Sequence, residues 1–371
     1  ICLSSKHKTM AHYFNEAGYD TAYIGKWHLG TQRLAVPEEE RGEYKYWLGA
    51  GALEASSRPY DTVVFDNKNN RIKLPGNRID ALTDAAIRYI DGHQTKPFFM
   101  FLSFLEPHFQ NSNDSFPTPY SMKPITNPYI PPDLNALHGT AHQHLPGYYG
   151  MVKRLDECLG RIQDALRSLN LEQDTILLFT TDHGCHFKTR NAEYKRSCHE
   201  SSIRIPMAFY GGPFTGGTIQ ELINLVDVAP TLLDACGIAV PADMQGKSIM
   251  PIVQRKPYEW RDCVFAQISE AEVGRTIRTH RWKYAVTAPD RDPGRDSGSD
   301  HYEEAFLYDL EEDPYELQNL IGMPSHRQLA ELLQKKLIRE MEKVGEATPI
   351  IEKAPEIPCK QRKVFPGEEN Q

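Results

Sequence analysis

One short segment concentrates residue types that could bind a metal ion and an anion. The segment TTDHGCHFKTRNAEYKRSCHE, residues 180–200, directly follows DTILLF, an apolar run typical of a buried strand. Its acidic, imidazole and cationic side chains are Asp182, His183, His186, Lys188, Arg190, Lys195, Arg196 and His199. Two interpretations are open: a solvated loop whose charges balance, or a metal-dependent site for an anionic ester.

Polar side chains also follow two other apolar runs. AYIGKWHLG ends in Lys26 and His28, and FFMFLSFLEPHF ends in Glu106 and His108. Ligands of α/β sheets collect at the carboxyl ends of the strands, so the sequence predicts that these groups and the Asp-His pair meet. A carboxylate and an imidazole suit a cation, whereas lysine and histidine side chains suit an anion.

Each of these residues also has a structural interpretation. Asp182 can cap a following helix while His183 packs in the core. Lys26 and His28, which would share one face of a strand at a period of two residues, can lie on a solvated strand edge. A lone histidine at a strand end is often structural, and the Lys-Arg pair before SCHESSIRIP can be surface charge. Charged and imidazole side chains follow three separate predicted strands, and this repetition favours the functional interpretation.

The elements that would position these residues alternate along the chain. Amphipathic spacing predicts helices within residues 8–18, 78–93, 145–170 and 226–237. Apolar runs predict buried strands within residues 20–27, 96–104, 174–181 and 205–212. This alternation predicts an α/β layered domain with a largely parallel sheet.

The composition changes after residue 255. CVFAQIS, GRTIRTHRWKYAVT and EAFLYDL are short alternating strands, RTIRTHRWKYAV indicates a hairpin, and HRQLAELLQKKLIREMEKVG indicates one helix. The sequence therefore predicts a catalytic domain over residues 1–255, an antiparallel α+β subdomain over residues 256–345 and an extended tail over residues 346–371.

Bulk composition excludes several classes of protein. The 371 residues carry a net charge of −8, which argues against a general nucleic-acid binder. The sequence contains no run of eighteen apolar residues, so we expect no membrane span. The seven cysteines are scattered without a CxxC pair, so neither a zinc ribbon nor a dense disulfide framework is indicated.

Longer stretches resemble the sulfatases of the alkaline-phosphatase superfamily. The stretches are HYFNEAGYDTAYIGKWHLG, GYYGMVKRLDECLGRIQDALRSLNLEQDTILLFTTDHG, EYKRSCHESSIRIP, PFFMFLSFLEPH, VDVAPTLLDACGI, QGKSIMPIV and LYDLEEDPYELQNL. They follow the family's order between residues 8 and 345. GKWHLG is a specific signature, whereas DHG is shared with phosphatases. The resemblance implies an α/β fold with an alkaline-phosphatase-like layered mixed sheet flanked by helices, and a smaller C-terminal α+β subdomain made of an antiparallel sheet plus one helix.

The resemblance also implies roles for individual residues. Asp182 and His183 would be the C-terminal pair of ligands for one Ca²⁺, although many relatives carry Asn at the second position. Lys26 would bridge the sulfate and the nucleophile, and His28 would position or deprotonate the nucleophile's hydroxyl. His108 and Lys195 would hold sulfate oxygens and support the leaving alcohol. S–O cleavage places negative charge on oxygens, which preorganised cations and a metal stabilise.

The sequence departs from the family in its nucleophile. Family members carry two metal-binding aspartates and then a Cys- or Ser-x-Pro-x-Arg motif whose first residue becomes formylglycine. The printed sequence contains neither, because CLSSK at Cys2 lacks the proline and the arginine. We expect the N-terminal part with the nucleophile to be missing, and the chain as given to be inactive.

The segment CHFKTRNAEYKRS is cationic and would lie beside the anion site. His199 stands where many relatives carry Tyr. Our hypothesis is that this segment, through Lys188 and Arg190, contacts a second anionic group of the substrate, such as another sulfate or a uronate of a glycan, and that His199 also binds substrate. Export to the periplasm, cell surface or medium is expected by family analogy alone, and the sequence does not indicate the oligomeric state.

Three functions remain open from the sequence. The first is a sulfuric ester hydrolase that removes sulfate from a sulfated carbohydrate. The second is a phosphodiesterase or phosphonate monoester hydrolase of the same superfamily, in which Mn²⁺ or Zn²⁺ would suit a histidine ligand better than Ca²⁺. The third is a protein that binds sulfated glycans without catalysis.

Overall fold

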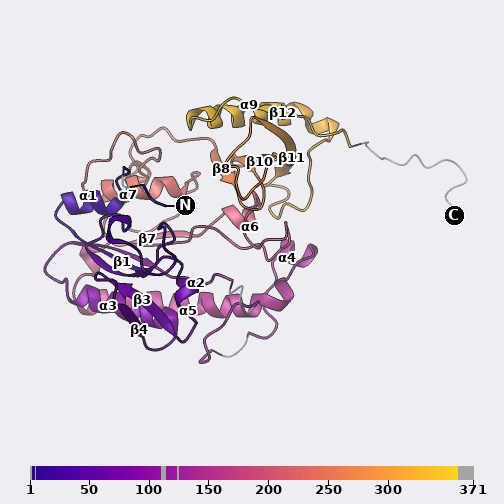
Figure 1. Cartoon of the computed structure of the whole chain (residues 1–371). Coiled ribbons are helices and arrows are strands. Elements are labelled where there is room, and N and C mark those ends of the chain that lie inside the picture. Colours follow the sequence, from indigo (N-terminus) through magenta and orange to yellow (C-terminus); the bar gives the residue numbers. More distant parts are fainter. Residues whose placement is uncertain (1, 5, 110–113, 123–124, 358–371) are drawn as a thin grey trace, which may run out of the picture.

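The computed structural model describes residues 2–4, 6–109, 114–122 and 125–357 (Figure 1). Within this part, a mixed five-stranded sheet and its helices form the N-terminal region. A second five-stranded sheet with one long helix forms the C-terminal region. This confirms the predicted fold class of a layered mixed sheet with a smaller C-terminal α+β subdomain.

The N-terminal sheet has the strand order β4-β3-β2-β1-β5. Its strands are β1 (Asp20–Lys26), β2 (Tyr46–Ala50), β3 (Thr62–Asp66), β4 (Arg71–Leu74) and β5 (Phe98–Ser103). β1 is central and pairs in parallel with β2 and β5, while β3 and β4 add antiparallel pairs. Gly25 of β1 has a φ of 111°, and a Cβ there would lie 1.9 Å from the Ser103 carbonyl oxygen. The close approach of β1 and β5 therefore requires glycine directly before Lys26.

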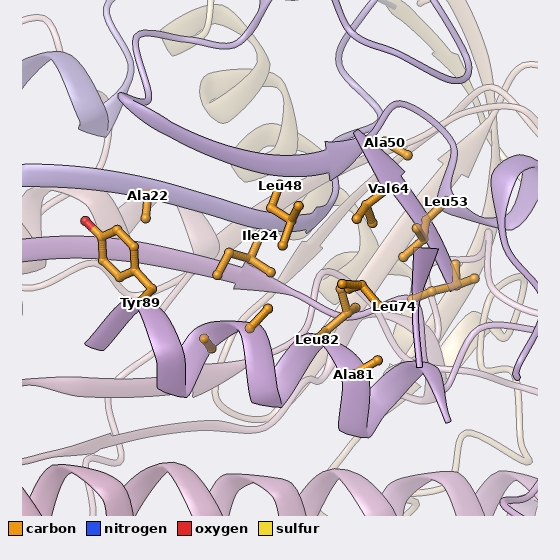
Figure 2. Close-up of a cluster of buried hydrophobic side chains, with 13 residues drawn as sticks. Ala22, Ile24, Leu48, Ala50, Leu53, Val64, Leu74, Ala81, Leu82 and Tyr89 are labelled. Carbon is orange, nitrogen blue, oxygen red and sulfur yellow. The ribbon is translucent and has the colours of Figure 1, made fainter. Parts of the chain in front are cut away.

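Helices lie on both sides of this sheet (Figure 1). On one side are α3 (Arg78–Asp91) and the long α5 (Ala141–Ser168), and on the other are α1 (Met10–Glu16) and α7 (Val228–Ala235). Figure 2 shows side chains of α3, among them Leu82 and Tyr89, packed against Ile24 and Leu48 of the sheet. Burial of this apolar layer holds the carboxyl end of β1 in a fixed place.

Shorter elements complete the N-terminal region. They are α2 (Leu53–Ser56), α4 (Pro132–Ala136), α6 (Glu200–Ile203), α8 (Met250–Val253), β6 (Leu177–Thr180) and β7 (Met207–Tyr210). β6 and β7 pair with each other in antiparallel fashion as a separate two-stranded sheet within the described residues. The prediction that the apolar runs at β5 and β6 are fully covered strands was wrong. Both strands are half-buried, because β5 lies at the edge of its sheet and β6 belongs to the two-stranded pair.

The C-terminal sheet has the order β12-β11-β10-β9-β8. Its strands are β8 (Val264–Ile268), β9 (Gly274–Arg278), β10 (Trp282–Thr287), β11 (His301–Asp309) and β12 (Ile350–Glu352). The predicted hairpin is present as β9 and β10, and α9 (Arg327–Lys343) packs on the sheet through Leu333 and Leu337. β12 pairs in parallel with β11, so residues 350–352 belong to the sheet and not to the tail. The end of the predicted tail, residues 358–371, lies outside the described residues.

No helix in the described part of the chain is long and apolar enough to cross a membrane. The longest, α5, carries a polar face and has buried residues spaced along one side, such as Leu155, Ile162 and Leu166. That pattern is typical of a helix that covers a sheet.

Candidate active site

The first part of the site lies where β1 ends. Lys26 is the last residue of β1, and its Nζ lies 3.4 Å from the carboxylate of Glu54 in α2. The strand does not continue to His28, whose backbone φ is 59°, so the predicted sharing of one strand face does not apply. Burial, followed by the charge of Lys26, lowers the pKa of His28. The two side chains therefore lie within electrostatic range of each other.

The segment after β5 contributes His108 but not Glu106. Glu106 pairs in the interior with Arg78 of α3, with 2.6 Å between the carboxylate and the guanidinium. Nδ1 of His108 lies 2.6 Å from the Phe109 carbonyl oxygen, and Nε2 lies 2.8 Å from the Tyr194 hydroxyl. A neutral ring that donates from Nδ1 to the carbonyl can accept a hydrogen bond at Nε2 from Tyr194.

Lys195 joins these groups from the segment between β6 and α6. Burial, followed by the charge of Arg196, lowers the pKa of Lys195, and Lys26 acts in the same direction. Burial, followed by the charges of Lys26 and Lys195, lowers the pKa of His108 to about 4. The four residues predicted to be catalytic are thus assembled from three separate segments of the chain.

Sequence reasoning missed two carboxylates and one hydroxyl of this cluster. The charge of Glu54 partly offsets the lowered pKa of His108, and Glu270 forms an ion pair with Arg196. Tyr194 donates to His108. Glu270 directly follows the predicted strand CVFAQIS, and this position was the signal that could have marked it, whereas Glu54 lies in the short helix α2 and carries no such signal. Tyr194, however, lies within the predicted cationic segment, directly before Lys195.

The predicted metal pair lies at the end of β6. The Asp182 side chain is 81% exposed, and its Oδ2 lies 3.4 Å from Nε2 of His183. Nδ1 of His183 lies 2.8 Å from the Gly184 carbonyl oxygen, which leaves the lone pair of a neutral ring at Nε2, beside the carboxylate. Nowhere in the described residues do three or more His, Cys, Asp or Glu side chains form a group that could hold a metal. The donors fit part of a site, because Ca²⁺ usually takes roughly six to eight oxygen ligands.

The three predicted substrate-binding residues have different surroundings. Lys188 is exposed, and its Nζ lies 5.9 Å from the centre of the Phe109 ring. Arg190 donates from both terminal nitrogens to the backbone carbonyls of Tyr315 and Glu316. These contacts tie Arg190 to the segment that follows β11, so Lys188 is the one of the three residues that is exposed to solvent.

His199 is buried, and its position differs from the predicted one. Nε2 of His199 lies 3.2 Å from the Tyr308 hydroxyl of β11, and burial lowers the pKa of His199 to about 2. Because the ring packs against β11 in the interior, we expect no direct contact between His199 and a substrate. The sequence missed this because β11 lies more than one hundred residues away along the chain.

This arrangement can bind and transform a small anion. Lys26 and Lys195 supply two positive charges, and the anion would displace the weak contact between Lys26 and Glu54. His28 and His108 have lowered pKa values, so both rings are neutral near pH 7. The Asp182–His183 pair adds donors for a cation. These groups suit the binding of an anionic ester, and no nucleophile has been identified among them.

Comparisons with known proteins agree with this chemistry. Residues 1–238 match the sulfatase family, and residues 192–343 match the C-terminal part of N-sulphoglucosamine sulphohydrolase. The chain is 28% identical to an ulvan-active sulfatase from Formosa agariphila over 366 residues, which cover 93% of this chain and 68% of the relative. It is 23% identical to an N-acetylglucosamine-6-O-sulfatase from Bacteroides thetaiotaomicron, over 92% of this chain and 73% of the relative.

Solved structures show the same fold. A protein described in work on the metabolism of multiple glycosaminoglycans by Bacteroides thetaiotaomicron superposes with a TM-score of 0.77 at 22% identity, over 93% of this chain and 78% of that one. A structure solved in complex with its substrate D-glucosamine-2-N,6-O-disulfate superposes with a TM-score of 0.70 at 21% identity, over 92% of this chain and 83% of that one. The fold, the extent of the family match and the named relatives lead to one conclusion: this chain belongs to the sulfatase family and is a sulfatase.

Proposed function

We propose that this protein is a sulfuric ester hydrolase whose substrate is a sulfated carbohydrate. Two named relatives support the substrate class, one being an ulvan-active sulfatase and the other an N-acetylglucosamine-6-O-sulfatase. The single observation that carries the proposal is the cluster of Lys26, His28, His108 and Lys195, drawn together from three segments. Such a cluster suits an ester whose charge lies on several oxygens.

The two lysines would bind the sulfate oxygens. Burial and neighbouring positive charges lower the pKa of Lys195, which means that its charged form is destabilised. A bound anion would offset this destabilisation by its opposite charge. Lys26 contacts Glu54 only at 3.4 Å, which is long for a charge-assisted hydrogen bond. Both cations are therefore available to an incoming sulfate.

The two histidines would move protons. A bound sulfate places negative charge near His108 and raises the pKa of that ring from its low resting value, which favours protonation at Nε2. A ring that gains a proton in the complex can pass it to the leaving alcohol. His28 is neutral at rest and suits deprotonation of a nucleophile's hydroxyl.

We also propose that Asp182 and His183 hold one divalent cation, Ca²⁺ by family resemblance. When bound, this ion would polarise a sulfate oxygen as a Lewis acid. The carboxylate of Asp182 suits Ca²⁺, whereas the imidazole of His183 favours Mn²⁺ or Zn²⁺. The formylglycine motif of the family does not occur in the printed sequence. We therefore propose that the residues of the candidate active site supply the sulfate-binding and proton-transferring part of the hydrolase, and that this chain alone binds the ester without turning it over.

Binding of a sulfate ester tests the proposed anion site directly. Isothermal titration with N-acetylglucosamine 6-sulfate should show binding that Lys195→Ala weakens by roughly 10- to 100-fold, the usual worth of a hydrogen bond to a charged group. Lys335→Ala is the matched control, because Lys335 is an exposed lysine on α9. Equal affinities in Lys195→Ala and Lys335→Ala would contradict the proposal. Tighter binding of N-acetylglucosamine 6-phosphate would favour the phosphatase alternative.

Lys188 provides a test of the predicted second anion contact. It is exposed on the same cationic segment as Lys195, so we propose that it contacts a second sulfate or a uronate. Lys188→Ala should weaken binding of D-glucosamine-2-N,6-O-disulfate more than binding of the 6-monosulfate. An equal change for both ligands would exclude this role.

A further inference from the structure

Two tyrosines far apart in sequence form a stacked pair on the surface. The rings of Tyr60 and Tyr120 are 4.7 Å apart between centroids and 8° from parallel. The Tyr120 backbone N–H donates to the Tyr60 hydroxyl at 2.7 Å. Tyr120 is 88% exposed, although a large aromatic residue usually buries much of its surface. The outer face of its ring is therefore presented to solvent in a held orientation.

Tyr120 lines two neighbouring hollows. One hollow, of about 360 Å³, is lined by Thr118, Pro119, Tyr120, Met122, Pro146 and Gly147. The other, of about 340 Å³, includes Arg58, Tyr60 and Asp61 and shares Thr118 and Tyr120 with the first. Each hollow has the size of a small-ligand site, and together they make a groove with an aromatic centre and a charged end.

The loop that carries Tyr60 is firmly anchored. The Ser57 hydroxyl and the Val63 backbone exchange hydrogen bonds at 2.9 Å in both directions. The Arg78 backbone N–H donates to the Pro59 carbonyl at 2.8 Å, which fixes the loop to the start of α3. A ligand that stacks on this pair would not have to order the loop first, so binding there costs less conformational entropy.

The groove lies within reach of the proposed active site. Tyr60 follows Glu54, the residue beside Lys26, by six positions. Six residues span at most roughly 20 Å even when fully extended, and part of this stretch is helical, so the true separation is shorter. A sugar chain that places a sulfate at Lys26 could therefore extend to Tyr120 within a few units.

We propose that Tyr60 and Tyr120 form a subsite for a second sugar ring of the substrate chain. This rests on the proposed function, because the occupant is the continuation of the sulfated carbohydrate. A pyranose ring has an apolar face that packs on the outer face of Tyr120, as aromatic rings favour flat apolar contacts. Its hydroxyls would face the polar rim at Arg58, Asp61 and Thr118. The site would select oligosaccharides over monosaccharides.

The experiment compares chain lengths in the full chain by isothermal titration. The probes are N-acetylglucosamine 6-sulfate and tetrasaccharides prepared from ulvan, heparin, chondroitin 4-sulfate and chondroitin 6-sulfate. Tyr120→Ala should weaken the tightest tetrasaccharide by roughly 3- to 10-fold and leave the monosaccharide unchanged. Tyr129→Ala is the matched control, because Tyr129 is 68% exposed and the Tyr149 hydroxyl donates to its backbone carbonyl, which the substitution keeps.

The outcomes separate this proposal from the proposed function. If the unaltered chain binds monosaccharide and tetrasaccharides, and Tyr120→Ala matches Tyr129→Ala, the subsite is overturned while the sulfate site stands. If Tyr120→Ala weakens both ligands equally, the tyrosine acts on the sulfate site itself and the subsite is also overturned. If the unaltered chain binds no sulfated probe, the proposed function fails, and the subsite fails with it. Tyr120→Phe should retain the stack and the tetrasaccharide affinity.

Discussion

A buried ion cluster joins the two regions of the molecule, and its removal is the sharpest test of the structure. Nζ of Lys283 in β10 is fully buried and lies 2.6 Å from Glu316 and 2.8 Å from Glu200. The Glu200 backbone N–H donates to the second oxygen of Glu316 at 2.7 Å. Lys283→Met would keep the length of the side chain and leave the Glu316 carboxylate without its cation, while Glu200 would keep Arg278 at 3.5 Å.

The cost follows from burial. The Glu316 side chain is 1% exposed, so its charge has no access to water when the lysine is removed. Breaking a buried pair by removing one partner usually lowers the free energy of unfolding by about 3–5 kcal/mol. That is a large part of the roughly 5–15 kcal/mol that stabilises a typical domain. Burial already raises the pKa of Glu316, so the variant should recover stability at acidic pH, where this carboxyl is protonated.

Urea unfolding followed by tryptophan fluorescence measures this change, because Trp282 precedes Lys283 in β10. Lys343→Met is the matched control: Lys343 is 68% exposed and pairs with Glu340 within α9, so less than about 1 kcal/mol should be lost. The double variant Lys283→Met/Glu316→Gln should recover much of the loss, since the glutamine can still accept from the backbone. Equal losses for Lys283→Met and Lys343→Met would refute the reasoning.

Three further predictions concern single groups. Both ring nitrogens of His186 are buried without a hydrogen-bond partner in the described structure, and burial lowers the pKa of His186 to about 4. The neutral ring of His186 contributes to the free energy of unfolding above pH 6.5, and this contribution is lost as the pH falls toward 4, at up to about 1.4 kcal/mol per pH unit. His186→Phe should therefore reduce the pH dependence of the free energy of unfolding measured in urea. An unchanged slope would show that the ring is hydrated. Glu54→Gln should tighten inorganic sulfate binding several-fold in low-salt calorimetry, because Lys26 loses its competing carboxylate; weaker binding would mean that Glu54 positions Lys26 for the anion. Ca²⁺ should raise the melting temperature of the EDTA-treated chain, and Asp182→Ala should abolish the shift; no shift with Ca²⁺, Mn²⁺ or Zn²⁺ would exclude the metal site.

The convergence of the catalytic candidates could be predicted from sequence. Lys26 ends β1 and His108 lies in the segment after β5, and the carboxyl ends of strands meet at one edge of a layered fold. Lys195 lies farther along the segment after β6, and its role was implied by the family resemblance. The reason given for His28 was wrong, because the strand ends two residues earlier and the backbone turns to positive φ. The alternation of side chains along a strand does not show at which residue the strand ends.

Partners from distant segments could not be predicted. Glu54 and Tyr194 carry no periodic signal, and the contact of His199 with Tyr308 depends on how the C-terminal sheet packs. Burial of β5 and β6 was overpredicted, because an apolar run does not reveal whether its strand lies at a sheet edge. The three residues of β12 are too few to show alternation.

The boundary at residue 255 is a boundary of composition and not of function. Lys195 lies on a segment that is fastened to the C-terminal region on both sides, by Arg190 at the Tyr315 carbonyl and by Glu200 at Lys283. A fragment that ends at residue 255 would lose both contacts, and Lys195 would no longer be held in its position. The C-terminal sheet therefore helps to hold Lys195 in the anion site. A shortened or fused protein should keep both regions if the anion site is to stay intact.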